Sequence, residues 1–171
     1  MAVGEHLTYA RDFFRLDYPA EWLVRENRPV GVTEFYHPAA HTGHTGVYPP
    51  GVALMTLPET GMELELLLRT GVFFLTRDLQ GPTVERLGEQ PGDGGDELTW
   101  RRLLVRGRAP VARTGTGGVP GVPIYHDIVK RVALARPGPG VLVLALFGLA
   151  GAIAPLDEDF ETLRRSVRVT R

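Results

Sequence analysis

A run of seven apolar residues, Val141 to Phe147, constrains the fold more than any other part of the sequence. Successive side chains of a strand point to opposite faces, and this run is apolar at odd and even positions alike. Other parts of the protein must therefore cover both faces. Even when extended to Ala154, the stretch is interrupted by glycine and is shorter than the roughly 20 residues of a membrane-spanning helix. We expect an interior strand of a sheet packed on two sides, and no membrane insertion.

Length and composition narrow the classes of protein. The chain has 171 residues, 43% of them hydrophobic and 23% charged, which suits one globular domain over residues 1–171. It contains no cysteine, so disulfides, thiolate metal sites and cysteine nucleophiles are excluded. The net charge of -1 argues against a nucleic-acid partner, because phosphate binding needs excess positive charge.

Two further features concern the source of the chain. The first residues lack a basic segment followed by an apolar run, which predicts a cytoplasmic protein. Arginine almost replaces lysine, and Lys130 is the only lysine. We interpret this bias as that of a GC-rich bacterial genome, without a functional meaning.

Short strands separated by proline and glycine make up most of the sequence. Proline has no N–H for a sheet ladder and so stands at strand ends. We expect the first three strands to form a meander and the last two to pair antiparallel. The expected strands are Phe13–Tyr18, Trp22–Glu26, Val30–Tyr36, Gly51–Leu57, Thr83–Gly88, Leu98–Arg108, Ile124–Ala135 and Val141–Phe147.

Two helices complete the expected fold. One begins at Thr60, which forms a capping box with Glu63, and ends before Gly81-Pro82, although Gly71 weakens its middle. The second begins near Asp157, and a short strand can follow it. The elements predict an α+β fold, an α/β/α sandwich in which helices flank a mainly antiparallel sheet of about six or seven strands.

The order of these elements and two local stretches resemble the PsbP-like fold superfamily. The stretches are Phe14–Trp22, with its Tyr-Pro and Trp, and Asp159–Val167, a closing helix that ends in Ser. The superfamily includes the extrinsic photosystem II subunit, a Ran-binding transport factor and DcrB-type bacterial domains. The resemblance implies a non-catalytic module that binds other macromolecules, and it implies no site residues.

His37, His41 and His44, with Glu34 before them, are the only candidate metal ligands that we single out. Imidazoles at this spacing could converge on zinc or nickel. A proline and two glycines within the segment argue against a helix that would fix the spacing, so a polar surface loop is the simpler interpretation.

Five other features favour structural roles over chemistry. Trp100–Arg108 is typical of a solvated edge strand more than of a nucleic-acid surface. The glycine-rich segment Thr114–Gly121 lacks a phosphate-loop signature and predicts a flexible loop. His126 shares a face with isoleucines, which favours a core histidine over a general base. Ser166 lacks the elbow motif of a serine hydrolase. The acidic turn at 93–97 lacks the spacing of a calcium loop.

These observations predict a non-enzymatic binding or adaptor module. Its expected partner is another protein, and we expect no cofactor. The alternative is a small-molecule or metal-binding protein, which could be enzymatic, built around the loop from His37 to His44.

Overall fold

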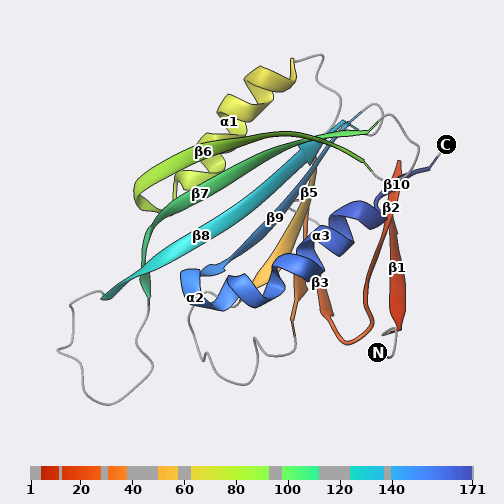
Figure 1. Ribbon diagram of the computed structural model, residues 1–171, viewed down its shortest axis with the longest axis horizontal. Helices are drawn as coiled ribbons and strands as arrows, with labels where there is room; N and C mark the ends of the chain where they lie inside the picture. Colours follow the sequence, from red (N-terminus) through yellow and green to blue (C-terminus); the bar gives the residue numbers. More distant parts are fainter. Residues whose placement is uncertain are drawn as a thin grey trace.

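A seven-stranded antiparallel sheet forms the centre of the computed structural model, which describes residues 5–11, 13–27, 31–37, 50–57, 63–92, 98–111, 124–136 and 140–170 (Figure 1). The strand order is β3-β4-β5-β9-β8-β7-β6, and every neighbouring pair is antiparallel. The predicted pairing of the last two long strands is confirmed, because β8 pairs with β9. The strands are β3 (Leu23–Asn27), β4 (Val32–Tyr36), β5 (Gly51–Leu57), β6 (Gln80–Pro91), β7 (Thr99–Val111), β8 (Ile124–Ala135) and β9 (Val141–Leu149).

A second, three-stranded sheet corrects the predicted meander. It consists of β1 (His6–Arg11), β2 (Phe14–Pro19) and β10 (Arg168–Val169), with β2 in the middle. The meander prediction was wrong because β2 and β3 belong to different sheets. The N–H of Trp22 donates to the carbonyl of Pro19 at 3.0 Å, and this tight turn leads the chain from one sheet to the other. The short strand predicted after the second helix is confirmed as β10.

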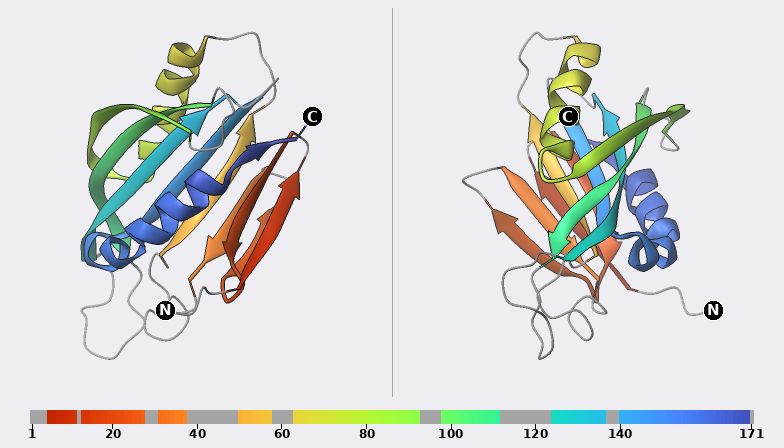
Figure 2. Two further views of the ribbon diagram at one scale, coloured as in Figure 1. Left: turned by 45° about the vertical axis from the view of Figure 1, so that its right-hand side comes forward. Right: turned by 90° about the vertical axis from the view of Figure 1, so that its left-hand side faces the viewer.

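Two longer helices lie on opposite sides of the main sheet (Figure 2). The first, α1 (Leu64–Thr76), begins four residues after the predicted start, and Thr60 lies outside the described residues. Gly71 does not interrupt it, and the helix ends before Gly81-Pro82, both of which lie in β6. The second, α3 (Asp157–Ser166), is confirmed where predicted. It follows two short turns, α2 (Ala150–Ile153) and η3 (Ala154–Leu156).

Strand β9 has a hydrophobic core on each of its faces, as its sequence predicts. Leu142, Leu144 and Leu146 belong to one core together with residues of the small sheet and α3, including Phe14 and Phe160. The odd positions from Val141 to Ala145 belong to a second core with residues of α1 and of β7 and β8. From Val141 to Leu146 the apolar run is thus buried on both faces, and Phe147 is half-buried.

The α+β class is confirmed, but the chain is richer in strands than predicted. The described residues form ten strands in two sheets, where about six or seven in one sheet were expected. The strand that was not predicted at all is β1, whose residues are mostly exposed and carry little strand signal. On the face of the main sheet that carries α3, residues of the small sheet also pack against the main sheet, whereas helices alone were predicted to cover it.

Candidate functional site

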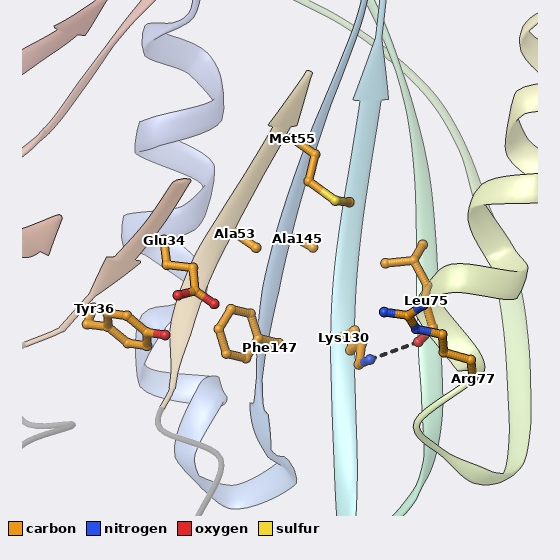
Figure 3. A pocket seen from close by; sticks show the side chains of 9 residues that line it. All are labelled: Glu34, Tyr36, Ala53, Met55, Leu75, Arg77, Lys130, Ala145 and Phe147. Carbon is orange, nitrogen blue, oxygen red and sulfur yellow. Dashed lines mark hydrogen bonds between the residues drawn. The ribbon is translucent and has the colours of Figure 1, made fainter. Parts of the chain in front are cut away.

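The main sheet has a hollow on the face that carries α1. There α1 packs on β6 and β7. A cavity of about 540 Å³ opens between the end of α1 and β4, and we call it the sheet groove (Figure 3). Its size lies within the usual range for ligand sites. Its floor consists of Ala53, Met55, Ala145 and Phe147, one wall of Glu34 and Tyr36, and the other of Leu75, Arg77 and Lys130.

Two alanines create the hollow. Ala53 of β5 and Ala145 of β9 are directly opposite in the antiparallel register, so their side chains lie on the same face. The longer side chains of Met55 and Phe147 flank this pair within the same two strands. The small methyl groups leave space that larger residues would fill.

Glu34 and Tyr36 form the polar wall on the β4 side. They are two residues apart on one strand and so project from the same face. The pKa of Tyr36 is raised to about 12. Partial burial of the phenol is the largest cause, and the hydrogen bond to Glu34 and the negative charge of Glu34 add to it. Arg25 is directly opposite Glu34 on β3, and its charge opposes this rise. The phenol therefore stays protonated at neutral pH and is suited to hydrogen bonding.

Lys130 forms a structural clamp on the opposite wall. It lies on β8 with only 7% of its surface exposed. Its Nζ donates to the carbonyl of Leu75 at 2.8 Å and to the two carboxylate oxygens of Asp78 at 2.7 and 2.9 Å. All three ammonium protons thus have acceptors, and the contacts hold the end of α1 against the sheet.

Two smaller hollows of about 310 and 210 Å³ lie between α1 and strands β6 and β7. Glu65 of α1 bridges Arg86 at 2.5 Å and Arg101 at 3.3 Å there. The hydrogen bond from Arg86 is the main reason that the pKa of Glu65 is lowered. We interpret this set as the attachment of α1 to the sheet.

The predicted metal ligands are only partly described. His37 is half-buried, and its ring packs edge-on against Trp22 with 5.8 Å between centroids. His41 and His44 lie outside the described residues, and within the described part no group of three or more potential ligands could hold a metal. The metal site stays a prediction, and metal analysis of the protein and of a His37/His41/His44 triple alanine variant tests it.

Two predictions about single features were wrong. His126 was predicted to be a core histidine, but it is exposed, and so is its neighbour Asp127. Both lie near the start of β8, at the end of the strand that extends past the core. The segment Trp100–Arg108 lies in β7, an interior strand, and β6 forms the edge. Trp100 is fully buried beneath Arg164, whose guanidinium lies 5.7 Å from the ring centroid. The segments 93–97 and Thr114–Gly121 lie outside the described residues.

Similarity to solved structures identifies the fold. The chain is similar to cyanobacterial PsbP (CyanoP) from Synechocystis, with a TM-score of 0.55 and 14% identity over 99% of this chain and 96% of that protein. The chain has a PsbP-like fold. The two stretches that carried the predicted resemblance meet in the structure, since the N–H of Asp17 donates to Ser166 Oγ at 2.9 Å.

A second similar structure is that of a protein from Bacteroides thetaiotaomicron, with a TM-score of 0.51 and 12% identity. The match covers 98% of this chain, which spans about half the length of that protein. No protein-family model matches the sequence, and no curated protein is similar to it. In the described residues, no helix is long and apolar enough to span a membrane. These similarities establish the fold alone.

Proposed function

We propose that the chain is a non-enzymatic binding module and that the sheet groove is its binding surface. The observation that carries this proposal is the preformed apolar floor of the groove, set between two polar walls. Apolar hollows with a few placed polar groups are typical of binding sites. The PsbP-like fold supports the same proposal by analogy.

The polar groups of the groove are suited to binding more than to proton transfer. Tyr36, with its pKa of about 12, keeps its proton and hydrogen-bonds to Glu34. Lys130 holds the end of α1 through all three of its ammonium protons. A general base at neutral pH needs a pKa near that pH, which this phenol does not have.

The partner is proposed to be another protein, because apolar surface continues beyond the groove. Leu23 of β3 lies directly opposite Tyr36, on the same face, and 53% of it is exposed. Leu23 thus lies beside the polar wall that Tyr36 forms at the edge of the groove. An exposed apolar surface of this kind, edged with polar residues, suits contact with a protein.

Site-specific photocrosslinking tests the proposal. A benzophenone amino acid at Leu23 should capture one partner in producing cells, whereas the same group at Val84, 38% exposed on edge strand β6, should not. The variant Ala53→Leu, which fills the groove, should reduce capture at Leu23 while the protein stays folded. Equal capture from both positions, or capture at Leu23 that Ala53→Leu leaves unchanged, would contradict the proposal.

A further inference from the structure

We propose that the open edge of strand β3 pairs with the same strand of a second copy of this chain, in an antiparallel arrangement centred on Val24. The inference goes beyond the proposed function, because it concerns the edge of the main sheet and not the groove. It follows from the unequal protection of the two sheet edges, from an exposed apolar seam beside β3, and from the order of charges along β3.

The two edges of the main sheet differ in how they are protected against pairing. Edge strand β6 contains Pro82, and its register with β7 is interrupted at two places. Proline and irregularities of this kind discourage the addition of another strand. The five residues of β3 are all exposed, and they pair with β4 in an unbroken register. Among the described residues, no strand lies on the other side of β3.

The edge strands of the two sheets lie together. Figure 1 shows β1 and β3 on the side of the molecule away from β6. The hydroxyl of Tyr9 on β1 donates to the carboxylate of Glu26 on β3 at 3.1 Å. A second copy that reaches β3 therefore also meets β1.

An apolar seam is exposed between these two edge strands. Tyr18 of β2 and Phe35 of β4 are in ring contact between the sheets, with 5.2 Å between their centroids. Their directly opposite neighbours on the edge strands are Leu7 of β1 and Val24 of β3, which place their side chains at the open side of this contact. Leu7 is 44% exposed and Val24 is 37% exposed. We call these two residues the edge seam.

The order of residues in β3 restricts how two copies can pair. In an antiparallel pair with a twofold axis normal to the sheet, one residue meets its own copy at the axis. An axis at Arg25 or at Glu26 would place like charges directly opposite each other, which is unfavourable. An axis at either end of the strand would leave a single pair within β3. An axis at Val24 joins two apolar side chains and brings the two edge seams together.

This pairing would join the two main sheets into one continuous sheet. Because the axis is normal to the sheet, the two sheet grooves would open on the same face. The paired surface is small, so we expect weak association, with a dissociation constant of about 10 µM to 1 mM.

Single cysteines test the position of the axis, because the chain has no cysteine of its own. Directly opposite Cα atoms of an antiparallel pair are about 4.5 to 5.5 Å apart, which suits a disulfide. Under one oxidant, Val24→Cys should form a covalent dimer at least about tenfold faster than Val84→Cys, because pairing concentrates its two thiols. Val84 is the matched control, since it lies on edge strand β6 and is 38% exposed. Arg25→Cys should also be slower than Val24→Cys.

Sedimentation velocity measures the association without a crosslink. Val24→Lys should weaken it at least about tenfold, because two ammonium groups would meet at the axis. Val84→Lys should leave it unchanged, and so should Ala53→Leu, which fills the groove. Thermal unfolding shows whether each variant remains folded.

Four outcomes would overturn the inference. These are a parent protein that stays monomeric up to about 1 mM, equal rates for Val24→Cys and Val84→Cys, a faster rate for Arg25→Cys, and association that Val24→Lys does not weaken. Crosslinking at Leu23 separates this inference from the proposed function. A monomeric parent whose Leu23 probe captures a different protein would reject the self-pairing and leave the proposed function standing.

Discussion

Ser166 and Asp17 are 149 positions apart in the sequence and share two hydrogen bonds. The N–H of Asp17 donates to Ser166 Oγ at 2.9 Å, and the same hydroxyl lies 3.1 Å from the carbonyl of Asp17 and 2.7 Å from that of Leu163. This serine, the only one in the chain, thereby attaches the end of α3 to the middle strand of the small sheet.

Ser166→Ala should destabilise the protein by about 1 to 2 kcal/mol, because the partly buried N–H of Asp17 loses its acceptor. Urea unfolding measures this change. Ser166→Thr keeps the hydroxyl and should restore most of the stability. An unfolding free energy that is the same in parent and alanine variant would show that the hydroxyl contributes nothing.

Lys130→Met should destabilise the protein by about 2 kcal/mol, because the carbonyl of Leu75 and the carboxylate of Asp78 lose a charged donor. Asp78→Asn, which keeps one acceptor oxygen, should cost less. Hydrogen exchange should increase at the last turn of α1 and at the amide of Leu79, which bonds to Thr76 O. Unchanged exchange there would argue against the clamp.

Two glycines should respond to alanine with opposite signs. A Cβ at Gly71 meets no atom within 4 Å, so Gly71→Ala should stabilise α1 by about 1 kcal/mol through helix propensity. A Cβ at Gly107 would lie 2.8 Å from Cβ of buried Leu79, so Gly107→Ala should destabilise by about 1 to 3 kcal/mol. Thermal unfolding of the two variants compares them directly, and changes of the same sign would contradict the packing described for β7.

Alkaline titration should show that the phenol of Tyr36 has a pKa near 12. The absorbance of tyrosinate measures this titration, and Tyr36→Phe should remove the transition near pH 12. Glu34→Gln should lower the pKa of Tyr36, because it removes a charged acceptor. Between pH 10 and about 12 the unfolded chain has released a proton that folded Tyr36 retains. The stability that Tyr36 contributes is thus fully present below pH 10 and is lost as the pH rises toward 12. Tyr36→Phe should show a shallower fall in stability over this interval.

Local patterns in the sequence predicted elements well and their partners poorly. Turn residues located β8 and the acidic residues from Asp157 located α3, because both signals act within a few residues. The assignment of β2 to a separate sheet depends on β1 and β10, and β10 lies about 150 residues away. Such long-range pairing leaves no mark in local spacing, and the meander prediction failed for this reason.

The sheet groove was missed for a related reason. Ala53 and Ala145 both lie in strands that were predicted correctly, but their juxtaposition depends on the pairing of β5 with β9. Glu34 and Tyr36 were available at strand spacing, yet alternation alone does not show which face a helix leaves bare. A search for small residues at outward positions of buried strands is the signal that could have located the floor.

The central place of β9 has a consequence for synthesis on the ribosome. This strand joins β5 on one side to β8 on the other, yet it follows both of them in the chain. As translation proceeds, the nascent polypeptide therefore contains two half-sheets with open edges before the residues that unite them are made. Pairings between segments so far apart in sequence form slowly. A chain released before residue 141 would thus expose two unpaired sheet edges, and early chaperone binding would protect them.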